Sequence, residues 1–226
     1  MSGTKTRREL VIFDCDGILV DSEPTSNRVL AGAITQAGIP MNPEEVAHTF
    51  EGMRLRDIQI NVEGQLGSKL PTHWLGNFEA ERAAAFEKGL AAIPGVADAI
   101  SQASTAGLSI CVASQARREK MELTLGLTGL SDYFPASALF SSTMVERGKP
   151  YPDLFLLAAE SMGFEPDRCI VVEDGVPGIW AGRRAGMRVL GYASGSNAER
   201  LARAGAQVFT SMATLPELLG IGSGDH

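Results

Sequence analysis

Short apolar runs recur along the chain, and most are followed by longer stretches in which apolar residues return at helical spacing. Runs rich in Val, Ile, Leu and Phe with few polar residues are typical of buried strands in parallel sheets. We therefore predict strands at Leu10–Phe13, Leu108–Ala113, Ala138–Phe140, Cys169–Val172, Arg188–Tyr192 and Gln207–Phe209.

The stretches between the later strands have the pattern of helices. Gly107, Gly186 and Gly205 each stand just before a predicted strand, and a glycine there can end the preceding helix. Alternating strands and helices indicate βαβ units, which form a parallel sheet covered on both faces. The predicted class is α/β, a Rossmann-like doubly wound sheet, with helices at Asp153–Met162, Pro177–Ala185, Ala198–Ala204 and Ala213–Leu219.

One region has no convincing strand signal. Between Pro24 and Lys88 the pattern predicts several helices, separated by Gly38-Ile39-Pro40, Gly52, Gly67 and Leu70-Pro71. Ala92-Ile93-Pro94-Gly95 marks the return to the sheet. We therefore predict two domains, an α/β core of residues 1–20 and 89–226 and a small helical domain of residues 21–88 inserted into it.

Composition and charge narrow the class of protein. The chain has 226 residues, of which 44% are hydrophobic and 21% charged, which is ordinary for a globular protein. The net charge of −7 argues against nucleic acid as a partner. No segment approaches the length of a membrane span, and the run after the polar start is too short for a signal-peptide core.

The cysteines and histidines exclude some chemistries. Cys15, Cys111 and Cys169 lie within or at the end of predicted strands, without CxxC spacing, so we expect buried free thiols and no zinc site. Free thiols suit a reducing compartment, and we predict a cytoplasmic protein without a membrane partner. The three histidines are widely spaced, which argues against a mechanism led by histidine.

Acidic residues follow two of the predicted strands. Asp14 and Asp16 come directly after the first strand, and Glu173 and Asp174 follow the strand Cys169–Val172. Taken alone, the Asp-Gly sequence after the first strand also suits a simple turn. Ligands of open α/β sheets bind beyond the carboxyl ends of the strands, so four carboxylates converge there if the two strands are neighbours. All-oxygen ligands without Cys or His suit Mg²⁺.

Two further residues can bind an anion. Ser114 ends the second strand and opens the predicted helix Ala116–Leu125, where a hydroxyl can cap the helix or contact a bound anion. Lys149 lies in a loop held by Pro150 and Pro152, which fix the backbone that presents its side chain. Lys149 can also offset one of the carboxylate charges.

These groups together suit phosphoryl transfer. A carboxylate nucleophile can form an aspartyl-phosphate and so divide one difficult displacement into two easier ones. Mg²⁺, Lys149 and Ser114 with nearby backbone N–H groups would hold the phosphoryl oxygens. A second carboxylate can protonate the leaving alkoxide and then deprotonate the attacking water.

With these residues the chain resembles the haloacid dehalogenase superfamily, in particular its phosphatase branch with a helical cap. This branch includes β-phosphoglucomutase and small sugar-phosphate phosphatases. The order and spacing of its motifs agree with those of that family, and the resemblance extends from Leu10 to Leu219. The four motifs match Asp14–Glu23, Ser114, Gly148-Lys149-Pro150, and Glu173-Asp174 with Gly178.

The resemblance implies roles for the acids. Asp14 resembles the nucleophile and a metal ligand, and Asp16 the general acid/base whose backbone carbonyl also contacts the metal. Asp174 resembles a direct Mg²⁺ ligand, and Glu173 a direct or water-bridged one. Asp16 also argues against a dehalogenase, since those relatives lack an acid at this place.

The resemblance also implies a phosphate site at Ser114, Gln115 and Lys149. Gln115 stands where Asn, Gly or Ala is common in the family, and Gly175 where Ser is common, which concerns the surroundings of the site and leaves its core chemistry unchanged.

The inserted helical domain resembles the cap that closes over the substrate. Gly52 and Arg54 match the cap segment that faces the site in relatives, and Arg54 can meet an anionic or hydroxyl-rich group. Arg56 is expected to be solvated. The large apolar residues of this region are assigned to the core of the cap: Met53, Trp74, Phe78 and Phe86.

The predicted function is a Mg²⁺-dependent phosphatase that hydrolyses a small phosphorylated sugar, polyol or organic acid through an aspartyl-phosphate. The partner is thus a small-molecule phosphate ester, and a monomer is expected. One alternative is a phosphomutase of the β-phosphoglucomutase kind, which would use the same residues. Another is a non-catalytic regulator that binds metal or phosphate, although such a protein would lack Asp14 or Asp16.

Overall fold

The computed structural model describes residues 9–195 and 197–222. Within these residues one six-stranded sheet has the order β3-β2-β1-β4-β5-β6, and every neighbouring pair of strands is parallel. This confirms the predicted α/β class. The strands are β1 (Leu10–Phe13), β2 (Ser109–Ser114), β3 (Leu139–Ser141), β4 (Cys169–Glu173), β5 (Arg188–Tyr192) and β6 (Gln207–Phe209).

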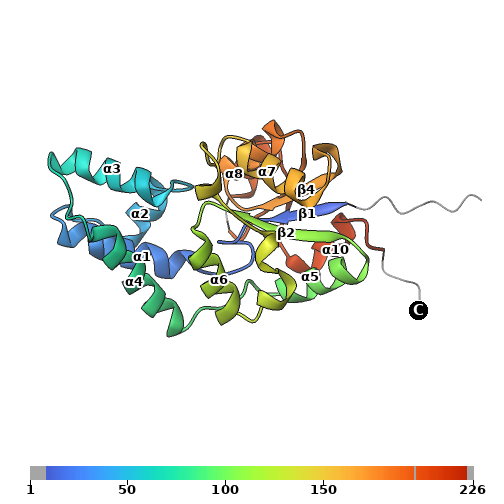
Figure 1. The fold of residues 1–226 in the computed structure, drawn as a ribbon, viewed down its shortest axis with the longest axis horizontal. Coiled ribbons are helices and arrows are strands. Elements are labelled where there is room, and N and C mark those ends of the chain that lie inside the picture. Colours follow the sequence, from blue (N-terminus) through green and yellow to red (C-terminus); the bar gives the residue numbers. More distant parts are fainter. Residues whose placement is uncertain (1–8, 196, 223–226) are drawn as a thin grey trace, which may run out of the picture.

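Helices cover both faces of the sheet (Figure 1). Residues of β1 alternate between the faces, so Leu10 and Ile12 join one apolar cluster and Val11 and Phe13 the other. This double burial explains why the strand is an uninterrupted apolar run. Helices α7 (Asp153–Met162), α8 (Val176–Arg184) and α9 (Ala198–Arg203) pack on one face, and α5 (Val96–Thr105), α6 (Arg118–Leu127) and α10 (Leu215–Leu218) on the other.

The predicted glycine stops are confirmed. Gly107, Gly186 and Gly205 follow α5, α8 and α9 and have positive φ angles of 82°, 79° and 102°. In each case the N–H of the residue after the glycine donates to a carbonyl five residues earlier, such as Leu108 N to Ala103 O at 3.1 Å. This bond satisfies a carbonyl that the end of the helix leaves open.

Helix α6 begins at Arg118, two residues later than predicted. The carbonyl of Gln115 accepts from Ser142 Oγ at 2.9 Å, and the carbonyl of Ala116 accepts from Ser141 Oγ at 2.7 Å. These carbonyls are therefore engaged outside the helix. Ser114 does not cap α6, since its Oγ accepts from the N–H of Ala116 at 3.2 Å, before the helix starts.

Residues 21–88, called here the helical insert, lie beside the sheet (Figure 1). They form α1 (Glu23–Gln36), α2 (Pro43–Thr49), α3 (Leu55–Leu66) and α4 (Trp74–Glu87), with no strand, as predicted. Their apolar residues make a cluster of their own, which includes Trp74 and Phe78 and against which Met53 packs. Phe86 is also buried.

The chain leaves the sheet for the insert and returns from it through two short segments that run antiparallel to each other. Asp21 N donates to Ala91 O at 2.9 Å, and Ile93 N donates to Leu19 O at 3.0 Å, so the outgoing and returning segments are hydrogen-bonded side by side. Single turns of 3-10 helix complete the fold at Ser131–Tyr133, Ala136–Ala138, Ser142–Met144, Pro166–Arg168 and Met212–Thr214. The last of these replaces the start of the predicted helix Ala213–Leu219.

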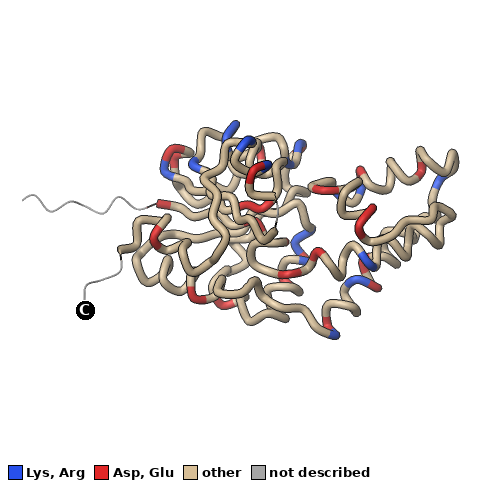
Figure 2. Tube along the Cα trace, turned by 180° about the vertical axis from the view of Figure 1, so that it is seen from behind, with Lys and Arg blue, Asp and Glu red and all other residues tan. Residues whose placement is uncertain are grey.

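The described residues bear on two further expectations. Cys15, Cys111 and Cys169 are buried and free, as predicted. In the part of the chain that the structure describes, no helix combines the length and apolar character that a membrane crossing needs. Positions of Lys and Arg are interleaved with those of Asp and Glu along the trace (Figure 2).

Candidate active site

The site lies at the carboxyl ends of three adjacent strands. Strand β1 pairs with β2 on one side and β4 on the other, so the acids that follow β1 and β4 come from neighbouring strands. Asp14 follows β1, Ser114 ends β2 and Glu173 ends β4. The N–H of Asp14 donates to Val172 O at 2.9 Å, which continues the ladder to the first functional side chain.

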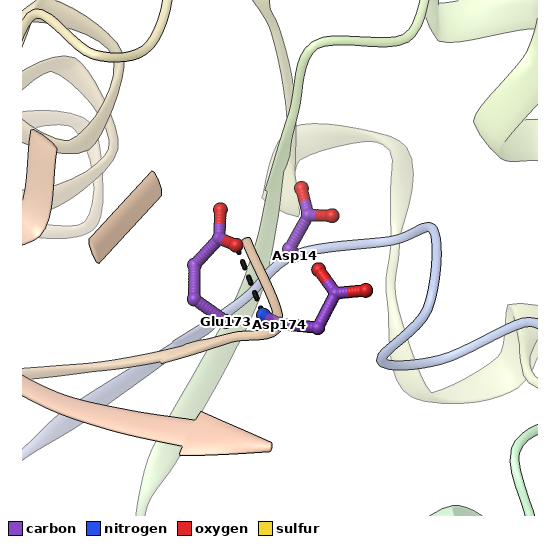
Figure 3. Close-up of side chains that lie close together, drawn as sticks. All are labelled: Asp14, Glu173 and Asp174. Carbon is purple, nitrogen blue, oxygen red and sulfur yellow. Dashed lines mark hydrogen bonds between the residues drawn. The ribbon is translucent and has the colours of Figure 1, made fainter. Parts of the chain in front are cut away.

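Three carboxylates and one ammonium group meet there. Asp14, Glu173 and Asp174 offer oxygens that all lie within 4.8 Å of one another (Figure 3). Lys149 Nζ donates to Asp14 Oδ1 at 2.5 Å and to Glu173 Oε1 at 2.6 Å. Lys149 thus offsets carboxylate charge, as predicted, but three carboxylates, two buried and one half-buried, face one cation.

This excess of negative charge perturbs ionisation. Burial raises the pKa of Asp14 to about 7, with Lys149 opposing the shift and Glu173 adding to it. Burial and the charge of Glu173 raise the pKa of Asp174 well above its usual value. Burial alone would lower the pKa of Lys149, but the charges of Asp14 and Glu173 reverse the shift and raise it. An oxygen-only group with surplus negative charge fits a hard divalent cation.

Both oxygens of Glu173 have fixed donors. Oε1 accepts from Lys149, and Oε2 accepts from the backbone N–H groups of Asp174 at 3.0 Å and Gly175 at 3.1 Å. Helix α8 packs so closely that a Cβ on Gly178 would lie 1.7 Å from Oε1. The missing side chain at Gly178 therefore leaves the room that this carboxylate occupies.

Asp16 does not join the carboxylate cluster. Its side chain accepts hydrogen bonds from Lys120 and Ser22 instead. Burial tends to raise the pKa of Asp16, but Lys120, Ser22 and the charge of Arg82 together lower it below its usual value. The prediction that four carboxylates converge thus holds for three, because Lys120 of α6 and Ser22 bind the fourth, Asp16.

The side chain of Gln115 contacts protein backbone. Its Oε1 accepts from Lys149 N at 3.2 Å, and its Nε2 donates to Lys149 O at 3.3 Å and to Gly52 O at 3.1 Å. The amide thereby links the segment that carries Lys149 to the loop between α2 and α3. Ser114 lies beside it, almost fully buried at the end of β2.

A cavity of about 1240 Å³ extends from the strand ends to the helical insert. The loop between α2 and α3 closes one side of it. A Cβ on Gly52 would lie 2.7 Å from Pro177 Cγ, so this loop touches the core closely. Arg54 lines the cavity half-buried, with its Nη1 donating to Glu146 O at 3.4 Å and its Nε 3.4 Å from Asp57 Oδ2. Arg56 is exposed.

Several residues of the cavity carried no sequence signal. Lys120 and Arg82 lie within helices, outside any motif, and only the fold brings them near Asp16. Arg200 of α9 holds both carboxylate oxygens of Glu51, at 2.7 Å each, across 149 positions of sequence. Ser22 belongs to the first motif, although the motif alone did not indicate its contact with Asp16.

Comparisons with known proteins show the family of the chain. A family model described as haloacid dehalogenase-like hydrolase matches residues 9–186. The chain is 36% identical to 6-phosphogluconate phosphatase of Escherichia coli K12, over 94% of this chain and 95% of that protein. It is 30% identical to hexitol phosphatase A of the same organism, over 84% and 85%. The crystal structure of a HAD family hydrolase from Deinococcus radiodurans R1, with bound phosphate and sodium, matches with a TM-score of 0.75 and 32% identity, over 96% of this chain and 99% of that one.

The chain belongs to the haloacid dehalogenase-like hydrolase family, as its four motifs predict. The full-length similarity to phosphatases also confirms the expectation that it is a phosphoric monoester hydrolase.

Proposed function

We propose that this hydrolase is a Mg²⁺-dependent phosphatase that acts on a small phosphorylated sugar, polyol or organic acid through an aspartyl-phosphate on Asp14. The observation that carries the proposal is the group of Asp14, Glu173 and Asp174 with Lys149, at the strand ends and open to a large cavity. The names of the relatives support the substrate class, since they act on a sugar-acid phosphate and on hexitol phosphates.

Asp14, Asp174 and the backbone carbonyl of Asp16 would hold the Mg²⁺ ion directly. Glu173 would act through a bound water, because its two oxygens already accept from Lys149 and from two backbone N–H groups. When bound, Mg²⁺ would supply positive charge against the phosphoryl oxygens and against the surplus of carboxylates.

Asp14 would attack the phosphorus atom, so the ester oxygen leaves and a phosphoryl group remains on the carboxylate. Lys149 sits beside Asp14 and would neutralise a phosphoryl oxygen. Ser114 at the end of β2 would donate its hydroxyl to another, together with the backbone N–H of Gln115. The Gln115 side chain would keep Lys149 in place through both backbone groups of that residue.

Asp16 would transfer the protons. It would give one to the leaving alkoxide and later take one from the water that attacks the aspartyl-phosphate. In the structure the contacts with Lys120 and Ser22 favour ionised Asp16, the form that the second step requires. The first step requires its protonated form, so we expect the contact with Lys120 to loosen when substrate fills the cavity.

The helical insert would serve as the cap domain, residues 21–88, with Gly52 and Arg54 on its substrate-facing loop. Closure over the strand ends excludes bulky phosphoproteins and water, which favours a small substrate. Arg54 would contact the part of the substrate that is remote from the phosphate.

The central experiment removes the nucleophile. Asp14→Asn should lower the rate of p-nitrophenyl phosphate hydrolysis in Mg²⁺ by about 1000-fold or more, because the covalent step is lost. Asp98→Asn, an exposed site on α5, is the matched control and should retain full activity. Circular dichroism should show the same fold for both variants. A rate above one tenth of wild type in Asp14→Asn would contradict the assignment.

Product analysis separates hydrolysis from phosphomutase chemistry, which would use the same aspartyl-phosphate with a sugar as acceptor. With β-glucose 1-phosphate and a trace of the 1,6-bisphosphate, we expect release of inorganic phosphate. Rapid formation of glucose 6-phosphate with little free phosphate would favour the mutase.

A further inference from the structure

Arg82 of α4 is a buried cation in the wall of the active-site cavity. Its side chain is among the few charged groups that the fold buries, with 8% of the residue exposed. It lines the same cavity as Asp14, Asp16 and Lys149, but from the helical insert. Its guanidinium carbon lies 4.8 Å from the centre of the Phe78 ring, one turn earlier on the same helix.

The guanidinium group of Arg82 has no hydrogen bond and no ion pair with any residue that the structure describes. Two acids, Asp16 and Glu79, lie near enough for their charges to act on Arg82, but both contact other residues. Asp16 accepts from Lys120 and Ser22, and Glu79 Oε1 lies 3.4 Å from Arg117 Nε.

The neighbouring cations differ in this respect. Lys149 contacts Asp14 and Glu173, Lys120 contacts Asp16, and Arg54 contacts Asp57. Burial lowers the pKa of Arg82, yet a guanidinium group stays protonated in proteins. A buried guanidinium group that no acid contacts directly is unfavourable, so Arg82 suggests a partner that arrives with the ligand.

We propose that Arg82 binds a carboxylate of the substrate while the strand ends bind its phosphate. The substrate class is then a phosphorylated sugar acid or hydroxy acid, an assignment that rests on the proposed phosphatase activity. A guanidinium fork matches a carboxylate in shape, and the single charge of Arg82 is balanced by one carboxylate, whereas a second phosphate would bring surplus negative charge.

Two substrates that differ only at this group test the proposal. 6-Phosphogluconate carries a carboxylate at C1, and glucitol 6-phosphate has a hydroxymethyl group there with the same remaining carbons. We expect wild-type kcat/KM to be at least about 10-fold higher for the acid, because a charge-assisted pair in a buried site is strong. Arg82→Gln should lower kcat/KM for the acid by about 10- to 100-fold and change that for the polyol by less than about threefold.

Two further variants control for charge and folding. Arg56→Gln removes the same charge from an exposed position on the cavity wall, and it should leave the ratio of acid to polyol unchanged. Arg82→Lys keeps the charge without the fork and should give an intermediate ratio. Melting temperatures of all variants exclude misfolding as the cause.

Binding measurements on an inactive variant test the role of Arg82 separately from the proposed phosphatase activity. In Asp14→Asn, calorimetry should show tighter binding of 6-phosphogluconate than of glucitol 6-phosphate, and the added Arg82→Gln change should remove that difference. Wild-type hydrolysis without preference for the acid, or an equal loss for both substrates in Arg82→Gln, would overturn the carboxylate site. Absence of all ester hydrolysis would instead overturn the phosphatase assignment, and the binding ratio would still decide the role of Arg82.

Discussion

At the scale of single residues, Glu173 shows how a small neighbour positions a functional group. Its carboxylate lies where a Cβ on Gly178 would stand, 1.7 Å from Oε1. Gly178→Ala would displace that oxygen from Lys149 and disturb the three-carboxylate cluster. We expect kcat for p-nitrophenyl phosphate to fall by about 100-fold or more, since a shift near 1 Å in a reacting group has that effect.

Gly126→Ala in α6 is the matched control for Gly178→Ala, since a Cβ at Gly126 meets nothing within 4 Å. It should leave kcat unchanged and stabilise the protein by about 0.5–1 kcal/mol, because alanine favours the helix. Equal activity of the two variants would show that Gly178 is not needed to position Glu173.

The functional residues could be predicted from the sequence where they directly follow a strand. Asp14, Glu173 and Asp174 were found because acids directly after buried apolar runs are conspicuous, and parallel strands bring such ends together. Lys120 and Arg82 were not found, because a cation within a helix looks like any solvated residue until the fold buries it. The position of the Asp16 side chain depended on Lys120 and so was missed with it.

At the scale of elements, the loop between α2 and α3 is fastened to the core by polar contacts. Glu51 pairs with Arg200 of α9 through both oxygens, at 2.7 Å each, and Gly52 O accepts from Gln115. Arg200→Gln should raise KM for sugar-sized substrates by about two- to fivefold at low salt, since a partly exposed ion pair contributes at most about 1 kcal/mol. High salt should reduce the difference from wild type because it screens the pair.

Arg203→Gln provides the control on the same helix. Arg203 pairs with Glu199 within α9, far more exposed, and does not reach the insert. Its KM should match that of wild type at every salt concentration. A KM for Arg200→Gln equal to that of Arg203→Gln would mean that the Glu51 pair does not help to close the loop.

Near the end of α3, the carboxylate of Glu63 accepts hydrogen bonds that favour its ionised form. Glu63 accepts from Lys69 Nζ at 2.6 Å, Gln59 Nε2 at 2.9 Å and Leu70 N at 3.3 Å, and these hydrogen bonds, first that from Lys69, lower its pKa below 4.5. The folded state thus favours the ionised form, so the stabilisation is present above pH 4.5 and is lost as the pH falls through the lower folded pKa.

Glu63→Gln should therefore be less stable than wild type at pH 7, with a difference that shrinks as the pH falls below about 4.5. Urea unfolding between pH 3 and pH 7 measures this. Glu87→Gln, at the exposed end of α4, should follow the wild-type curve. A stability difference for Glu63→Gln that stays constant with pH would exclude ionisation of Glu63 as the cause.

The elements themselves were largely predictable. Strands β1, β5 and β6 begin and end as expected, and the other strands lie within one residue, since each is a compact apolar run between turns. The start of α6 was wrong because Ser141 and Ser142, from a distant strand end, take the carbonyls of Gln115 and Ala116. A local pattern does not contain such a contact.

At the scale of the whole molecule, the site carries more negative charge than the fold alone compensates. Three carboxylates lie close together beside Lys149, and burial together with Glu173 raises the pKa of Asp174. Repulsion among these groups is a cost to the metal-free protein at neutral pH. A divalent cation bound there would both relieve the repulsion and favour the folded state.

Asp174→Asn should therefore have opposite effects on stability and activity. Without Mg²⁺ the variant should melt at a higher temperature than wild type, because one like charge has been removed. Mg²⁺ at about 100 times its Kd should stabilise wild type by about 2.7 kcal/mol, a rise of roughly 5–10 °C in Tm for a chain of this size, and it should barely shift the variant. EDTA should abolish wild-type turnover, and the variant should be inactive in either condition.

Asp98→Asn should respond to Mg²⁺ as wild type does. An equal Mg²⁺ shift in Asp174→Asn would place the cation elsewhere, and a metal-free variant less stable than wild type would show that Asp174 stabilises the fold by contacts that outweigh the repulsion.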